Sequence, residues 1–219
     1  MTFFNRLGEN GERLARGASE LGLRLSVMQL EQLAQYALLL QKWSAVYNLT
    51  ANKSLSQIVS LHLLDSLAVV KPLLRELPSV QSVLDVGSGA GLPGVVLSIT
   101  IPDVQVHCID AVAKKAAFIN QTAISLGLGN LHAHHRRVEA LEGHFDLITS
   151  RAFASLTDFV TLTQKNLPEA GLWLAMKGKE SGAIEAPLPS GVEVFHVEHL
   201  QVPDLDAARS IVWLKKHQP

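Results

Sequence analysis

The sequence predicts an α/β fold in which a mostly parallel sheet, covered by helices on both faces, follows an N-terminal helical region. From residue 80 onward, short apolar runs of strand length alternate with longer segments of helical periodicity, which is typical of a parallel sheet. The first third shows helical periodicity instead. Hydrophobic residues make up 47% of the 219 residues, so the chain can bury a large core.

Two helices are predicted in the first third. Ser26 and Gln29 form a capping box, and apolar residues follow it at helical spacing. The polar segment 47–52 interrupts this pattern. A second helix is predicted over 55–71, and Pro72 is expected to kink or end it because proline cannot donate a helical hydrogen bond.

The remainder of the chain predicts seven strands and up to four helices. The strands are expected over 82–86, 104–109, 130–134, 145–150, 171–176, 191–198 and 209–215, and the helices over 92–100, 112–126, 155–167 and 179–186. No clear helix separates the last two strands, which predicts an antiparallel pair at the sheet edge. We expect an N-terminal helical region over 1–78, packed on a main domain over 79–219.

A glycine-rich segment after the first strand indicates a nucleotide-type ligand. Asp85 is followed by Gly87, Gly89, Gly91 and Gly94, so the backbone can turn tightly and approach a ligand. A strand, a glycine loop and a helix start together expose N–H groups that attract polar and anionic groups. The G-x-G-x-x-G spacing also fits a dinucleotide site, and the motif alone is weakly specific.

Three features favour S-adenosylmethionine over NAD. Asp85 precedes the first glycine, where a negative charge suits the cofactor's ammonium and sulfonium groups better than a pyrophosphate. Asp110 follows Gly94 by 16 residues, at the end of the next strand, where a carboxylate suits ribose hydroxyls of either cofactor. Too few residues remain after it for a second nucleotide half and a substrate domain. The paired edge strands also suit a methyltransferase sheet.

Several short segments then occur in a specific order. In the first third these are Trp43 with residues 47–50, and His62 with residues 65–67. Next come residues 85–94, and then Asp110 together with Lys114, Lys115 and Phe118. The last are residues 137–139, 150–154 and 177–178. Together they resemble the bacterial RsmG (GidB) family of 16S rRNA guanine-N7 methyltransferases, over nearly the whole chain. This chain departs from the expected pattern at Leu61, where a basic residue is expected just before His62.

The resemblance implies a Rossmann-like class I S-adenosylmethionine-dependent methyltransferase fold with a seven-stranded sheet. It implies cofactor contacts at Gly87, Leu92, Val138, Glu139 and Arg151, and related methyltransferases imply that Asp110 holds the ribose. With the loop residues, the expected cofactor-binding set is Asp85, Gly87, Gly89, Gly91, Leu92, Asp110, Val138, Glu139 and Arg151.

The side-chain chemistry agrees with a guanine N7 acceptor. Guanine N7 presents a lone pair and has no proton to lose, so an enzyme needs mainly to align donor and acceptor. Cys108 is the only cysteine and lies within an apolar strand, where it is expected to be a core residue and not a nucleophile. Residues 150–153 replace the Asn/Asp-Pro-Pro-aromatic loop that commonly handles exocyclic amines. An oxygen acceptor remains open.

Arg151, at the end of the fourth predicted strand, is the candidate catalytic residue in a positioning role. It is expected to neutralise a carboxylate, either the cofactor's or that of Asp85, or to touch the guanine, with a structural ion pair as the alternative. Phe153 is expected either to stack on a flipped base or to pack on the sheet. His62 and Asp65 are spaced to touch on one helix. The expected substrate residues are Asn48, His62, Phe153 and Lys177. A candidate phosphate-binding rim comprises Lys114, Lys115, Lys177 and Lys179.

The remaining expectations concern location and partners. No signal peptide and no apolar run of transmembrane length is apparent, and no metal site is expected from the histidines near residue 134, so we expect a cytoplasmic monomer without a membrane partner. The net charge of −1 favours a shaped RNA or ribonucleoprotein, here a small ribosomal subunit particle, over naked nucleic acid. A small-molecule methyltransferase and a non-catalytic nucleotide- or RNA-binding module remain the alternatives.

Overall fold

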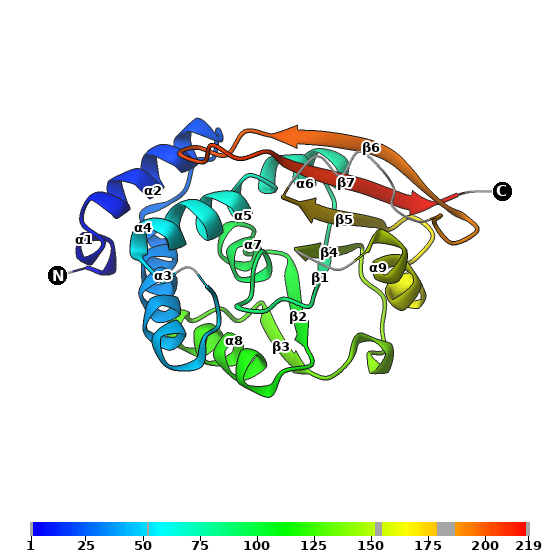
Figure 1. The fold of residues 1–219 in the computed structure, drawn as a ribbon, viewed down its shortest axis with the longest axis horizontal. Helices are drawn as coiled ribbons and strands as arrows, with labels where there is room; N and C mark the ends of the chain where they lie inside the picture. The colour runs from blue at the N-terminus through cyan, green and yellow to red at the C-terminus, as the bar shows by residue number, and fades with distance from the viewer. Residues whose placement is uncertain (1, 52, 152–154, 179–186, 218–219) are drawn as a thin grey trace.

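The computed structural model describes residues 2–51, 53–151, 155–178 and 187–217, and these form one seven-stranded mixed sheet with helices on both faces (Figure 1). The strand order is β3-β2-β1-β4-β5-β7-β6. The strands are β1 Ser82–Val86, β2 Gln105–Asp110, β3 Leu131–His135, β4 Leu147–Arg151, β5 Leu172–Lys177, β6 Val192–Leu200 and β7 Arg209–Lys216. All seven predicted strands are confirmed.

The first five strands run parallel, and β7 pairs antiparallel with both β5 and β6, which confirms the predicted antiparallel edge. The carboxyl ends of β1 to β5 therefore meet at one edge of the sheet. Because β7 runs the other way, its first residue, Arg209, lies at that same edge, opposite the end of β5. This edge is where parallel α/β sheets bind their ligands.

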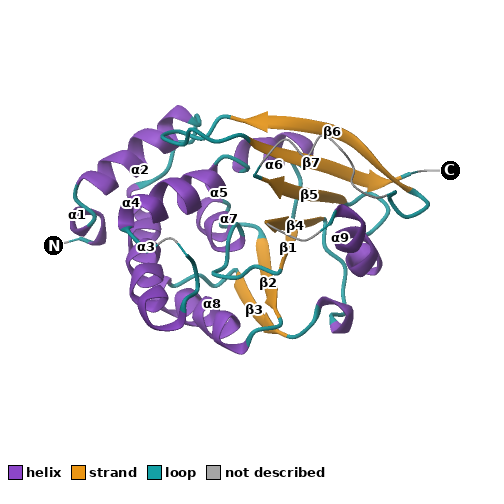
Figure 2. Ribbon diagram, viewed as in Figure 1, coloured by secondary structure: helices purple, strands orange, loops and turns teal. Residues whose placement is uncertain are grey.

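Helices cover the two faces unequally (Figure 2). The helices are α1 Phe3–Arg6, α2 Glu9–Glu20, α3 Val27–Tyr47, α4 Leu55–Ile58, α5 Asp65–Leu67, α6 Val70–Glu76, α7 Gly94–Thr100, α8 Ala113–Leu126 and α9 Leu156–Thr163, with a π-helix η1 at Val59–Leu64 and 3₁₀ turns η2 Val138–Ala140 and η3 Gln164–Asn166. The N-terminal helices, α7 and α8 pack on one face, and α9 packs on the other. The helix predicted over 179–186 lies outside the described residues.

Pro72 does not end the second N-terminal helix, and of the two predicted outcomes the structure shows an interruption of the helix beside this proline. Elements α4, η1, α5 and α6 follow one another from residue 55 to Glu76, and Pro72 lies in the first turn of α6. A turn at residues 68–69 interrupts the helical ladder just before it. A proline is tolerated in a first turn because its missing N–H is not needed there.

The span Leu55–Glu76 is also long and apolar enough to cross a membrane, contrary to the expectation that no segment approaches this length. Within its most apolar window, 78% of the residues are buried inside the protein. A helix enclosed in this way packs as a core helix of the fold.

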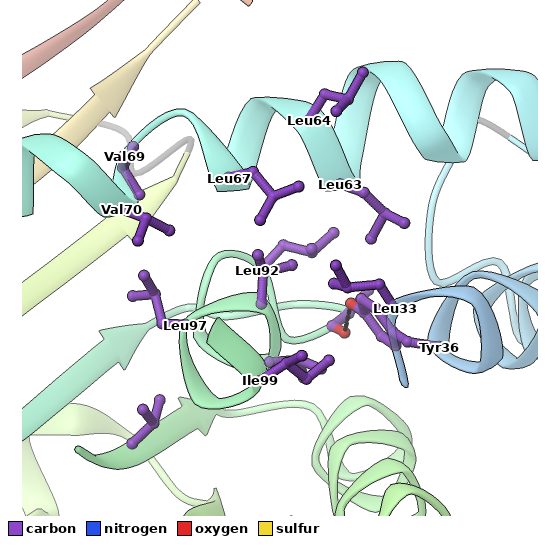
Figure 3. Packing of buried hydrophobic residues seen from close by; sticks show 14 of the residues in the cluster. Leu33, Tyr36, Leu63, Leu64, Leu67, Val69, Val70, Leu92, Leu97 and Ile99 are labelled. Atoms are coloured by element: carbon purple, nitrogen blue, oxygen red, sulfur yellow. Dashed lines mark hydrogen bonds between the residues drawn. The ribbon is translucent and has the colours of Figure 1, made fainter. Parts of the chain in front are cut away.

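The N-terminal helices share one hydrophobic core with the sheet domain (Figure 3). Leu33 and Tyr36 of α3 point toward Leu92 near the end of the glycine loop, and Leu67 approaches Leu92 from the other side. The capping-box residue Gln29 additionally donates from Nε2 to the Ile99 carbonyl at 2.9 Å, where α7 is ending. In the described part of the chain, the N-terminal helices and the sheet thus pack around one shared core.

Tyr36 connects this core to the glycine loop. Its side chain is fully buried, and its hydroxyl donates to the Ala90 carbonyl at 2.7 Å. We predict that Tyr36→Phe lowers the free energy of unfolding by about 1 kcal/mol, the usual value of a buried hydrogen bond. Urea denaturation measures this, with Tyr47→Phe as the matched control. Tyr47 is 44% exposed, and its variant should change stability by less than about 0.5 kcal/mol. Equal effects of the two changes would contradict the assignment.

Candidate functional site

The glycine loop, residues 87–93, has a backbone that side chains would not permit. Gly87, Gly89 and Gly91 have φ values of 65°, 59° and 87°, in the left-handed region. A Cβ on Gly91 would also lie 2.5 Å from Cγ2 of Val95. The loop therefore packs directly on α7 and turns its backbone toward the carboxyl edge of the sheet.

Asp85 lies beneath this loop and not in a cavity. Its carboxylate is fully buried, and Oδ2 accepts from the Gly94 N–H at 2.9 Å, at the start of α7. Burial raises the pKa of the Asp85 carboxyl to about 7. The expected direct contact of Asp85 with a cofactor has no support in this placement, because β1 alternation turns the side chain toward α7.

Leu92 is placed similarly. Its side chain is 2% exposed and packs in the core between the N-terminal helices and α7 (Figure 3). Any ligand contact at Leu92 must therefore come from its backbone. Gly89 and Gly91 likewise contribute backbone and the shape of the loop.

One cavity, which we call the β1–β3 cavity, brings together four of the nine predicted cofactor residues. It has a volume of about 250 Å³ at the carboxyl ends of β1, β2 and β3. Its lining includes Gly87, Asp110, Val138, Glu139, Arg136 and Arg137. The predicted residues Gly87, Asp110, Val138 and Glu139 come from three separate segments, so the fold alone assembles them.

Asp110 is held rigidly at this cavity. Its Oδ2 accepts from the Gly89 N–H at 3.0 Å, and its Oδ1 accepts from the Val112 N–H at 2.8 Å. Lys115 Nζ lies 3.4 Å from Oδ2. Lys115 therefore pairs within the site and is not a free cation of the predicted rim. The carboxylate, 6% exposed, is fixed in position before any ligand binds.

A second and larger cavity lies farther along the same edge of the sheet, and we call it the Arg151 cavity. It has a volume of about 450 Å³. Its lining includes His62 and Asp65 from the N-terminal helices, Arg151 of β4, Lys177 of β5 and Arg209 of β7. Arg151, His62 and Lys177 were predicted from sequence as site residues, and they lie together here.

Arg151 forms an ion pair, the alternative that the sequence left open. Its Nη1 lies 3.2 Å from Oδ2 of Asp65 and donates to the Leu61 carbonyl at 3.2 Å. Arg209 Nε lies 2.8 Å from the other oxygen, Oδ1 of Asp65. The Asp65 side chain is 5% exposed and the two arginines are 23% and 20% exposed, so the shared carboxylate is buried while both guanidinium groups still reach the cavity.

His62 and Asp65 both line the Arg151 cavity, but no hydrogen bond joins them among the described residues. The Nε2 of His62 lies 2.7 Å from Oγ1 of Thr50, and Nδ1 lies 3.0 Å from the Leu61 carbonyl. Residues three apart face each other on an α-helix, whereas His62 lies in the wider π-helix η1. Burial, followed by the charge of Arg151, lowers the pKa of His62 to about 4, so its imidazole is neutral at pH 7.

The other predicted substrate residues are dispersed. Asn48 is the left-handed C-cap of α3, and its Oδ1 accepts from Lys53 Nζ at 2.8 Å on the surface. It is not among the residues lining either cavity. Phe153 and Lys179 lie outside the described residues.

The sequence reasoning missed Arg209. It is an isolated arginine in a polar segment, with no motif to mark it. The only available signal is topological, since an antiparallel last strand must begin at the edge where β5 ends. His107 and His134 also form an unpredicted contact, 2.9 Å between Nδ1 and Nε2. No group of three His, Cys, Asp or Glu residues arranged to hold a metal ion occurs in the described part of the chain.

Known proteins match this chain in sequence and in fold. The profile of the family described as "GidB: rRNA small subunit methyltransferase G" matches residues 29–212. The chain is 53% identical over 205 residues to the ribosomal RNA small subunit methyltransferase G of Methylibium petroleiphilum, covering 93% of each chain. It is 50% identical over 216 residues to the protein of the same name in Albidiferax ferrireducens, covering 94% of this chain and 96% of that one.

Solved structures agree in fold. TrmN from Thermus thermophilus superposes with a TM-score of 0.56 at 18% identity, covering 72% of this chain and 53% of that one. A SAM-dependent methyltransferase from Aquifex aeolicus gives a TM-score of 0.51 at 16% identity, covering 66% and 88%. The predicted Rossmann-like class I methyltransferase fold is confirmed.

The buried Asp85 carboxyl predicts a pH-dependent stability. Its folded pKa of about 7 lies above its unfolded value, so the unfolded state releases the proton first as pH rises. The contribution of Asp85 to stability is thus present at pH 4 and lost as pH rises through about 7. We predict that wild-type protein loses on the order of 3 kcal/mol relative to Asp85→Asn between pH 4 and pH 8.

Urea denaturation at several pH values measures the difference in unfolding free energy between wild type and Asp85→Asn. The histidines titrate in both proteins, so their contribution cancels in this difference. The exposed Asp103→Asn variant is the matched control and should follow the wild-type pH profile. A wild-type profile parallel to that of Asp85→Asn would show that Asp85 does not titrate in this range.

Proposed function

The chain belongs to the rRNA small subunit methyltransferase G family, and from this premise we propose that it transfers a methyl group from S-adenosylmethionine to N7 of a guanine in 16S rRNA. The observation that carries the proposal is the pair of cavities at the carboxyl edge of the sheet. The β1–β3 cavity suits a nucleoside cofactor, and the Arg151 cavity beside it suits an acceptor.

The residues of the β1–β3 cavity suit the ribose and the adenine of the cofactor. Asp110 offers a fixed carboxylate for ribose hydroxyls, and Gly87 lets the backbone approach. Val138 offers an apolar contact for adenine, with Glu139 beside it as a hydrogen-bond acceptor. S-Adenosylmethionine supplies a methyl group carried on a positively charged sulfur.

In this proposal the side chains around the Arg151 cavity bind and orient the acceptor, and none of them acts as a base. His62 has a pKa of about 4 and is bonded to Thr50, which makes it a poor base at pH 7. Cys108 is fully buried, and burial raises the pKa of its thiol, so it is not a nucleophile. Guanine N7 needs neither group, because it already presents a lone pair. Arg151, which lines the Arg151 cavity from β4, the strand next to β1, is the proposed positioning residue.

The proposed partner is 16S rRNA within a small ribosomal subunit particle, and the proposed setting is the bacterial cytoplasm, with the protein acting as a monomer. The names of the relatives support the ribosomal RNA of the small subunit as the substrate class. The net charge of −1 supports a structured particle, because coating naked RNA demands a strongly basic protein. Lys177, His62, Asn48 and Phe153 stay proposed substrate contacts.

We predict that 16S rRNA from cells lacking this protein lacks one N7-methylguanine, and that purified protein with S-adenosylmethionine restores it. Chemical cleavage at N7-methylguanine followed by primer extension maps the position. Assembled subunits and protein-free 16S rRNA should be compared as substrates. Cofactor binding without rRNA methylation would favour a small-molecule methyltransferase, and no cofactor binding would favour a non-catalytic module.

A second prediction concerns the cofactor alone. Asp110→Asn keeps the shape of the side chain and removes its charge, which weakens hydrogen bonds from ribose hydroxyls. We expect the Kd for S-adenosylmethionine to rise about tenfold, the effect of losing about 1.4 kcal/mol. Isothermal titration calorimetry measures this, with exposed Asp103→Asn as the matched control. An unchanged Kd would remove Asp110 from the cofactor site.

A further inference from the structure

The Arg151 cavity carries an excess of positive charge. Lys177, Arg151 and Arg209 line it against the single carboxylate of Asp65, and His62 is neutral at pH 7. Its apolar lining comes from residues such as Leu61, Met176 and Leu200. A cavity of about 450 Å³ with apolar walls and two uncompensated cations suits a nucleotide, whose base is flat and whose phosphodiester is anionic.

The strand order separates this positive charge from the cofactor cavity. Arg209 begins β7, which lies three strands away from β1 in the order β1-β4-β5-β7. With neighbouring strands about 4.8 Å apart, the backbone of Arg209 is about 14 Å from that of β1. Arg151 of β4 is next to β1, so it alone of the two arginines is placed to serve the cofactor.

Asp65 fixes the direction of the Arg209 side chain. Its Oδ1 is 2.8 Å from Arg209 Nε, while Arg209 Nη1 donates to the carbonyls of Gly178 and Ala208 at 3.2 and 3.0 Å. Nη2 has no hydrogen-bond partner among the described residues, which leaves the N–H groups of this one nitrogen for an anion. The guanidinium is thus oriented before an anion arrives.

The π-helix η1 explains how Asp65 and Leu61 reach this place together. Short π-helical segments are rare and occur often at functional sites, because they widen a helix locally. Here η1 ends at Leu64, just before Asp65, and the Leu61 carbonyl within it accepts from Arg151. One helical segment thus holds both arginines, through a carbonyl and a carboxylate.

We propose that Arg209 and Lys177 bind a phosphodiester of the RNA beside the nucleotide to be methylated, and that Asp65 is the positioning residue that orients Arg209. The inference rests on the proposed function and deepens it by assigning the RNA-facing end of the acceptor cavity. Because Arg209 begins β7, three strands away from β1, an RNA phosphate is favoured over the cofactor's carboxylate as the anion that Arg209 binds.

The test uses Arg209→Gln in the full-length protein, with Arg75→Gln as the matched control. Arg75 is 52% exposed and pairs with Glu76 and Glu198 on the surface, so its variant has the same charge change far from the cavity. We expect Arg209→Gln to raise the KM for 16S rRNA or small subunits about tenfold and to leave the Kd for S-adenosylmethionine within twofold of wild type.

A direct binding measurement separates this inference from the proposed function. The affinity for a 16S rRNA fragment, measured at several salt concentrations, should lose about one unit of log–log slope in Arg209→Gln, the signature of one lost phosphate contact. Arg209→Lys should recover the slope and only part of the affinity, because it restores charge without the fixed planar group. This readout does not depend on methyl transfer.

Asp65→Asn tests the positioning role. It should raise the KM for RNA and leave the salt slope close to wild type, since both arginines keep their charge. Circular dichroism and thermal melting check that the variant is folded. An unchanged salt slope in Arg209→Gln would overturn the inference while methylation by wild-type protein upheld the function. A weakened cofactor Kd in Arg209→Gln would overturn it too, by assigning Arg209 to the cofactor.

Discussion

The close packing of the glycine loop and the start of α7 on the sheet is the constraint on which the rest of the structure depends. A Cβ on Gly94 would lie 2.3 Å from Sγ of Cys108, so α7 begins in direct contact with β2. Asp85 accepts the Gly94 N–H from below, and Tyr36 holds the Ala90 carbonyl from the side. With the loop held at its middle and at the helix start that follows it, the left-handed Gly87 places backbone at the β1–β3 cavity.

The N-terminal helices are part of the site because they hold the glycine loop in place and also supply His62 and Asp65 to the Arg151 cavity. Tyr36 comes from α3, and Asp65 comes from the segment that packs over Leu92. The loop before β7 is joined to the same helices, since Arg13 Nε lies 2.6 Å from Asp204 Oδ2. Contacts between the N-terminal helices and the C-terminal part of the chain therefore fix the positions of Arg209 and Asp65 relative to each other.

Sequence patterns predicted what is local in this fold and missed what depends on tertiary placement. Strand periodicity identified all seven strands, and Gly87, Asp110, Val138 and Glu139 do line one cavity. Three features required knowledge of three-dimensional neighbours. The turn before Pro72 allows the helix to continue to Glu76, the π-helix separates His62 from Asp65, and the antiparallel β7 brings Arg209 to the ligand edge. None of these leaves a local pattern.

The placement of charge also constrains how guanine N7 would be methylated. Methyl transfer to N7 leaves the base positively charged, so cations close to the base would oppose the reaction. In the Arg151 cavity both guanidinium groups are held toward Asp65, and the apolar residues Leu61, Met176 and Leu200 are available to the base. Arginines held in this way are better suited to bind a phosphate or carboxylate, whose negative charge does not change during the reaction, than a base that becomes positively charged. In the proposed function, the cations attract the substrate and the apolar wall contacts the base.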